Sequence, residues 1–215
     1  MYVCTSLFCE NPYISMSKAG LCFFIISVAP FKTCSSCPST SILIKSTISL
    51  EGWELIKRAY PKRQITFSPE YLRANHAMED FKNQKSVSIG GGDTTYWLRI
   101  LSTLSIPIEI KNPEILILTK YFRNSYLAMK VAFFNQMYDM ASEVGLEPNE
   151  LLQSVSDDPR IGKSHTYVNA DDRGYGGHCF PKDVSALLNT AHTKGVDLTI
   201  LSEAMQYNER LRDES

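Results

Sequence analysis

The sequence predicts an α/β fold with a parallel sheet in the first half of the chain and helices in the second half. Two observations support this prediction. Up to residue 110, short continuous apolar runs alternate with a helix-like segment, which is typical of parallel strands and their connections. From residue 112 onward, apolar residues instead recur at helical spacing. We therefore expect a sheet domain at residues 1–111 and an all-helical domain at residues 112–215.

Each strand is expected where β-branched and aromatic residues form a short run. Leu21–Ala29 is too short to span a bilayer, and the residues before it lack the basic character of a signal peptide, so we interpret it as a buried parallel strand. A helix is expected over Leu50–Arg63, between the second and third strands. The other predicted strands are Ser41–Thr47, Gln64–Ser68, Ser86–Gly92 and Ile106–Ile110.

The main helix of the second half is expected over Glu114–Val144. Pro113 suits the first helical position, Glu114 suits the first turn, and Gly145 ends the helix. Because its apolar residues occupy almost every face, we predict a buried helix that packs against its own chain and a second subunit, forming a homodimer. Shorter helices are expected over Asn149–Ser156, Asp183–Gly195 and Thr199–Leu211.

Composition limits the classes of partner. The 215 residues have a formal net charge of -1 and contain no long basic run, which argues against nucleic acid or an anionic membrane as the main partner. Five of the six cysteines lie in the first 37 residues, so we expect a reducing, cytoplasmic compartment. Cys34 and Cys37 form one CxxC pair, whereas a structural zinc site needs four ligands, so no metal is expected.

The stretch "DRGYGGHCFPKDVSALL" is the main candidate for chemistry. Cys179 lies in its glycine-rich loop, Lys182 follows three residues later, and a helix is expected to begin at Asp183. A nearby cation and a helix N-terminus both favour the reactive thiolate. Glycines such as Gly176 allow a ligand to approach the backbone closely. Asp183 is either the N-cap of the helix, which its spacing favours, or a carboxylate that orients water near the thiol.

A cysteine hydrolase is an alternative interpretation of the same loop. His178 is a poor general base for Cys179, because adjacent residues in an extended segment point in opposite directions. His165 or His76 could approach the thiol in the folded chain, but nothing in the sequence requires it.

Polar residues at two other places suggest a role. Lys120 and Asn124 are four residues apart on the most apolar helix, and a buried lysine requires a negative partner. The alternative is a lysine that extends to solvent near the helix end. Glu70 follows a strand end, where ligands bind in open α/β sheets. On its own, Glu70 is more simply interpreted as an acidic surface residue.

Several motifs together resemble the UDP-glucose/GDP-mannose dehydrogenase family. "IKST", "SPEYLRANHAMEDF", "LTKYFRNSYLAMKVAFFNQM", "DDPRIG" and "GYGGHCFPKD" occur in the order typical of that family. The resemblance covers about Leu21–Arg212. It implies a partial Rossmann-like, NAD-binding domain followed by a central helical dimerisation domain. It also implies the NAD-dependent, two-step oxidation of a sugar C6 alcohol to a carboxylate. UDP-glucose is the preferred substrate, because "DDPRIG" resembles that branch.

The resemblance also implies catalytic roles for five residues. Cys179 would capture the aldehyde as a thiohemiacetal, which a second hydride loss converts to a thioester that water hydrolyses. Asp183, together with Lys120, would act on water and developing charge. Asn124 would donate a hydrogen bond near the reacting carbon, and Glu70 would contact the sugar or act as a base.

Further residues would bind substrate or cofactor. By the same resemblance, Thr47 and Lys182 would face NAD, and Gly176 would line the sugar site beside Glu70, Lys120 and Asn124. Arg160, in "DDPRIG", would reach the substrate of a neighbouring subunit.

The sequence departs from the family pattern at the cofactor end. It contains no GxGxxG turn after any strand, the motif that holds a dinucleotide pyrophosphate. Ala74 replaces the second acid of the family's "PEFLRE" pattern, and Ile48 replaces the proline expected after "KST". We therefore expect weak NAD binding by this chain. The alternative is an inactive remnant that folds and dimerises without cofactor.

Overall fold

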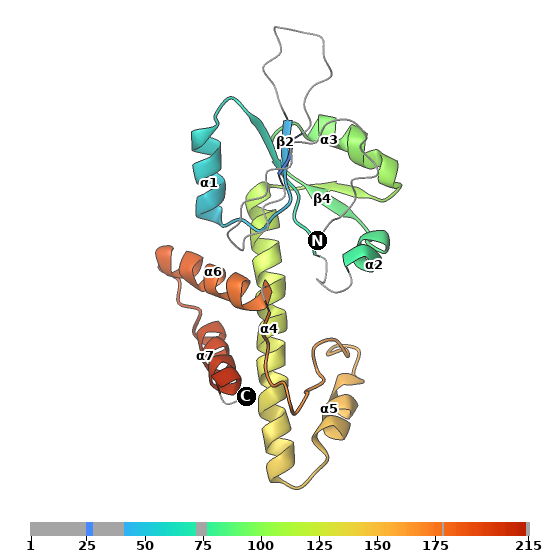
Figure 1. Ribbon diagram of the computed structural model, residues 1–215, viewed down its shortest axis with the longest axis vertical. Helices are drawn as coiled ribbons and strands as arrows, with labels where there is room; N and C mark the ends of the chain where they lie inside the picture. Colours follow the sequence, from blue (N-terminus) through green and yellow to red (C-terminus); the bar gives the residue numbers. More distant parts are fainter. Residues whose placement is uncertain (1–24, 28–40, 72–76, 178, 214–215) are drawn as a thin grey trace. The chain divides into compact units, whose positions relative to one another are not determined.

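The computed structural model describes residues 25–27, 41–71, 77–177 and 179–213 (Figure 1). The chain divides into two compact units, Met1–Lys120 and Tyr121–Ser215. The predictions made for Cys34, Cys37, Ala74, His76 and His178 lie outside the described residues.

The strands of the first unit form two small sheets. One sheet has the order β1 (Ile25–Ser27), β2 (Ser41–Ile44) and β3 (Gln64–Phe67), and the other pairs β4 (Val87–Ile89) with β5 (Ile108–Ile110). The pairs β2–β3 and β4–β5 are parallel, as predicted.

The prediction for the first strand was wrong in direction. β1 pairs with β2 in the antiparallel sense, with Ile26 opposite Leu43. An apolar run predicts a buried strand, but it contains no information about strand direction. An antiparallel edge strand on an otherwise parallel sheet is common.

Helices α1 (Leu50–Ala59), α2 (Ala77–Lys82) and α3 (Thr94–Leu101) complete the first unit with the short 3-10 helix η2 (Ser102–Leu104). The hydroxyl of Ser49 caps α1 by accepting a 2.9 Å hydrogen bond from the amide of Gly52. Sequence analysis predicted α1 but neither α2 nor α3. The core residues around these elements are Leu43, Val87, Ile89 and Trp97.

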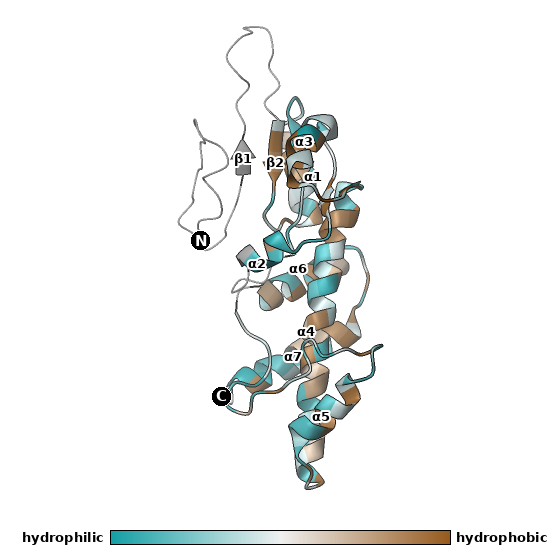
Figure 2. Ribbon diagram, turned by 90° about the vertical axis from the view of Figure 1, so that its right-hand side faces the viewer, coloured by the Kyte–Doolittle hydropathy of each residue, from teal (hydrophilic) through white to brown (hydrophobic). Residues whose placement is uncertain are grey.

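Helix α4 (Pro113–Glu143) is the long helix predicted from the sequence. The side chain of Asn112 accepts hydrogen bonds from the amides of Glu114 at 2.8 Å and Ile115 at 3.3 Å, which explains where the helix begins. Figure 2 shows apolar and polar residues interleaved along α4. In the single chain, Tyr126 and Phe133 are 59% and 52% exposed, so the chain by itself does not cover every apolar face of α4. None of the described helices is long and apolar enough to cross a membrane.

The second unit contains most of α4 together with α5 (Pro148–Ser156), α6 (Cys179–Thr193) and α7 (Thr199–Asp213). One part of its core contains Phe134, Leu152 and Val168. Helix α6 begins at Cys179 and not at Asp183, so the N-cap interpretation of Asp183 was wrong. The physical reason is that Pro181 is tolerated in the first turn of a helix, where its missing N–H has no intrahelical partner.

Candidate active site

The second unit buries a carboxylate that is held by a side chain of α4. Asp183 is 0% exposed, and its Oδ2 accepts a 2.6 Å hydrogen bond from Nδ2 of Asn124. Its Oδ1 lies 3.1 Å from Nζ of Lys182, but it accepts no hydrogen bond from the described residues. Burying a carboxylate with one of its oxygens unsatisfied is unfavourable. Such an arrangement therefore points to a functional role for the second oxygen.

The thiol of Cys179 lies one helical turn before this carboxylate. Cys179 is the first residue of α6, is exposed and forms no disulfide. Because Cys179 and Asp183 are four residues apart in one helix, their side chains share a helix face. The early start of α6 therefore brings together two residues that sequence analysis had placed on opposite sides of a helix boundary.

The glycine-rich loop before Cys179 is hydrogen-bonded to helix α4. Nε of Arg173 donates to Oδ1 of Asn135 at 2.7 Å, and its guanidinium also donates to Oδ1 of Asp139 at 2.8 Å. Gly174 and Gly177 adopt φ of 77° and 74°, the left-handed region that favours glycine. The loop is therefore held to α4 at Arg173, and its glycines at 174 and 177 provide the backbone angles that its turns require.

The first unit contains a separate group of charged side chains. Nζ of Lys45 donates to the hydroxyl of Ser68 at 3.2 Å. Burial lowers the pKa of Lys45, the nearby Glu70 raises it, and Lys120 lowers it. Lys45 and Glu70 follow β2 and β3 respectively, so this group lies at the carboxyl ends of two parallel strands. Thr47 lies half-buried two residues beyond Lys45.

Lys45 was not among the site residues predicted from the sequence. The signal available was its position directly after the predicted β2 strand, in the motif "IKST". A lysine at a strand end is usually a surface residue, and only the folded chain shows that this one is desolvated and coupled to Glu70 and Lys120.

Comparison with known proteins identifies the family. Residues 117–210 match the family model described as "UDP-glucose/GDP-mannose dehydrogenase family, central domain". A UDP-glucose 6-dehydrogenase of Campylobacter jejuni is 33% identical over 177 residues, which cover 79% of this chain and 43% of the relative. A UDP-glucose dehydrogenase structure from Pyrobaculum islandicum has a TM-score of 0.70 at 29% identity, covering 78% of this chain and 40% of that one. The chain belongs to the UDP-glucose/GDP-mannose dehydrogenase family.

The family assignment confirms the resemblance noted in the sequence and the Rossmann-like character of the fold. A UDP-D-ManNAc dehydrogenase structure from Pyrococcus horikoshii, 23% identical with a TM-score of 0.64, supports the fold alone. The chain spans about two fifths of the length of the family members that it matches.

The structure places the family's motif residues in two groups. Asn124, Lys182, Asp183 and the thiol of Cys179 belong to the second unit, whereas Thr47, Glu70 and Lys120 belong to the first. Gly176, also in the second unit, is exposed, and a Cβ atom there would lie 3.4 Å from the guanidinium carbon of Arg212.

Arg160, also in the second unit, points to solvent with its side chain 88% exposed, and it pairs with Asp158. That ion pair raises the pKa of Arg160 and lowers that of Asp158. The contacts with Asp158 use Nε and Nη2 of the guanidinium.

Of the three histidines considered in the hydrolase alternative, the structure describes only His165. The ring of His165 packs 5.6 Å from that of Phe180, and its Nδ1 contacts the hydroxyl of Ser164. Burial, and then the charge of Lys130, lower the pKa of His165. Within the described ranges, no group of three His, Cys, Asp or Glu side chains is placed to hold a metal ion.

Proposed function

We propose that this chain forms the sugar-oxidising part of an NAD-dependent UDP-glucose 6-dehydrogenase, which converts the C6 alcohol to a carboxylate. The observation that carries the proposal is the buried Asp183 carboxylate, oriented by Asn124 one helical turn after the exposed Cys179. Relatives that are 30–33% identical are UDP-glucose 6-dehydrogenases, which supports the same substrate here. We place the cofactor domain at residues 1–111 and the dimerisation domain at residues 112–215.

Cys179 supplies the covalent step. Its sulfur adds to C6 of the sugar aldehyde, a C–S bond forms, and the thiol proton moves to the carbonyl oxygen to give a thiohemiacetal. Bound NAD would supply the oxidant for C6, and with the hydroxyl proton taken up by a base the adduct on Cys179 would become a thioester. Water then adds to the thioester carbon, and the C–S bond breaks to release the carboxylate and the thiol.

Side chains of both units are assigned to water and charge in this scheme. The unsatisfied Oδ1 of Asp183 accepts a hydrogen bond from the attacking water, while Asn124 fixes the orientation of the carboxylate. Lys120 stabilises the negative charge that develops on the carbonyl oxygen, and Glu70 binds the sugar or removes the alcohol proton. Lys45 is electrostatically coupled to both Glu70 and Lys120, so it belongs to the same charged group.

The residues of this chain meet the requirements of an NAD-binding site only in part. Thr47 and Lys182 are available to face NAD, and NAD when bound is the hydride acceptor. The chain contains no GxGxxG turn, however, so the backbone amides that hold a pyrophosphate in Rossmann-like domains have no counterpart in its sequence.

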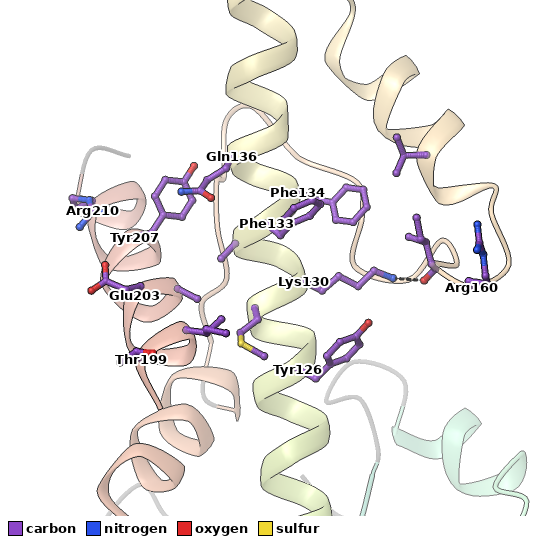
Figure 3. Close-up of a pocket in the computed structure, with 16 residues that line it drawn as sticks. Tyr126, Lys130, Phe133, Phe134, Gln136, Arg160, Thr199, Glu203, Tyr207 and Arg210 are labelled. Carbon is purple, nitrogen blue, oxygen red and sulfur yellow. Dashed lines mark hydrogen bonds between the residues drawn. The ribbon is translucent and has the colours of Figure 1, made fainter. Parts of the chain in front are cut away.

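A groove on the second unit supports the proposed homodimer. The groove has a volume of about 870 Å³. Its lining residues, drawn in Figure 3, include Tyr126 and Phe133 of α4 and Tyr207 of α7. Tyr126, Phe133 and Ile200 are 59%, 52% and 79% exposed, a large apolar area for one chain to leave in water. We propose that a second copy covers it. Arg160 borders the groove, which supports a role at the partner's substrate. We also propose that the enzyme is cytoplasmic and that its substrate is a nucleotide sugar.

The test supplies the aldehyde directly. UDP-glucose 6-aldehyde should add to Cys179 without any cofactor, because forming the thiohemiacetal is not a redox step. Native mass spectrometry should show one sugar nucleotide per chain, and the adduct should be absent from Cys179→Ser. GDP-mannose 6-aldehyde provides the comparison for nucleotide preference. An adduct of equal yield in Cys179→Ser would contradict the proposed role of the cysteine.

A further inference from the structure

Asn208 of α7 forms a two-bond clamp on the backbone of the cysteine loop. Its Oδ1 accepts a 2.6 Å hydrogen bond from the amide of Tyr175, and its Nδ2 donates to the carbonyl of Tyr175 at 2.9 Å. Both residues are 5% exposed. One side chain thereby satisfies both backbone groups of a buried loop residue, as a neighbouring strand would do.

The loop is shaped to admit this clamp. A Cβ atom at Gly174 would lie only 2.6 Å from Oδ1 of Asn208, and Gly174 adopts φ of 77°. Any other residue at position 174 would therefore displace Asn208 or strain the backbone. The amide of Gly174 in turn donates to Oδ1 of Asn135 at 3.2 Å, so neighbouring residues of the loop are held from two helices.

The clamped residue contacts the start of α6 directly. The ring of Tyr175 packs edge-to-face on the ring of Phe180, with centroids 6.0 Å apart. Phe180 is the second residue of α6, next to Cys179. A shift of the Tyr175 backbone would therefore be transmitted to the first turn of the helix that carries the thiol.

We propose that Asn208 is a positioning residue that holds the first turn of α6, and with it Cys179, through the backbone of Tyr175. The functional importance of this inference rests on the proposed role of Cys179 as nucleophile. Its physical content, that Asn208 sets the environment of the thiol, does not depend on catalysis.

The experiment measures alkylation of Cys179 by iodoacetamide as a function of pH, using mass spectrometry to resolve this cysteine from the others. In Asn208→Ala the first turn of α6 should loosen, and the helix N-terminus should favour the thiolate less. We expect alkylation of Cys179 at neutral pH to slow by roughly threefold and its pH profile to move to higher pH.

Asn149 provides a matched control. Its side chain makes the same kind of pair with Val168, accepting from the amide at 3.2 Å and donating to the carbonyl at 3.0 Å. Asn149→Ala should lower thermal stability to a similar extent but leave the alkylation profile of Cys179 unchanged. Equal changes of the profile in both variants, or no change in Asn208→Ala, would overturn the proposal.

A measurement on the unchanged chain covers the case in which Asn208→Ala does not fold. The amide of Tyr175 should exchange hydrogen as slowly as the interior of α7, whereas the exposed Gly176 should exchange quickly. Rapid exchange at Tyr175 would also overturn the proposal. None of these assays needs NAD or sugar, so their failure is distinguishable from failure of the proposed enzymatic activity, which the aldehyde adduct tests.

Discussion

Replacing Asn124 by alanine should destabilise the second unit by about 2–3 kcal/mol. The variant loses a 2.6 Å hydrogen bond to a carboxylate that is 0% exposed. Hydrogen bonds to charged groups contribute roughly 1.5–3 kcal/mol. Breaking a buried polar pair by removing one partner also leaves the other group uncompensated, which places the expected loss in the upper part of that range. Nζ of the partly exposed Lys182 lies 3.1 Å from the other oxygen, Oδ1, so it offsets part of the charge but does not replace the donor lost at Oδ2.

Urea unfolding followed by far-ultraviolet circular dichroism measures this loss. Helical signal is the suitable probe, because both tryptophans of the chain, Trp53 and Trp97, lie in the first unit. Gln206→Ala, which truncates an exposed amide on α7, serves as the control and should change stability by less than about 0.5 kcal/mol. A loss in Asn124→Ala no larger than in this control would refute the reasoning.

Asp183→Asn separates stability from function at the same site. It removes the buried charge but keeps an oxygen that can accept from Asn124. Its loss of stability should therefore be smaller than that of Asn124→Ala, because a buried carboxylate is costly to desolvate. Hydrolysis of the proposed Cys179 thioester should nevertheless slow, because the amide cannot activate water as a carboxylate does. If Asp183→Asn were the less stable of the two variants, the charge would not be the costly element of this site.

Four further outcomes are expected. Burial, and then the charge of Glu209, raise the pKa of Tyr175 from 10.0 to about 12. The stability that this group contributes should therefore be intact below about pH 10 and fall toward pH 12. In urea unfolding, Tyr175→Phe should flatten that fall. Cys179 should be alkylated faster at neutral pH than the other five cysteines, and mass-spectrometric labelling that ranked it among the slowest would contradict this. Calorimetry should show weak NAD binding or none, because several charge-assisted hydrogen bonds to the pyrophosphate are missing; ordinary turnover at sub-millimolar NAD would disprove the argument. Light scattering at micromolar concentration should give a dimer mass for the chain and a monomer mass for Phe133→Glu, whereas a monomeric unmodified chain would count against the interface.

The features that the sequence determined by itself are local ones. The start of α4 follows from Asn112, Pro113 and Glu114, since a cap, a fixed φ and an acidic first turn act within a few residues. The strands β2 to β5 follow from short apolar runs, and the parallel pairing of β2 with β3 follows from the helix between them. The motif around Cys179 is likewise a continuous stretch that can be recognised without a structure.

Tertiary structure decided the features that depend on distant residues. Asn124 and Asp183 are separated by 59 positions, and Asn208 and Tyr175 by 33, so no local pattern indicates that they form hydrogen bonds. The antiparallel direction of β1 and the desolvation of Lys45 are also consequences of neighbours that only the folded chain supplies. Asp183 illustrates the difference most clearly. Its position in the sequence fits a solvent-exposed helix cap, whereas the contact of α6 with Asn124 of α4 makes it a buried carboxylate. Burial depends on the three-dimensional surroundings of a residue and not on its sequence neighbours.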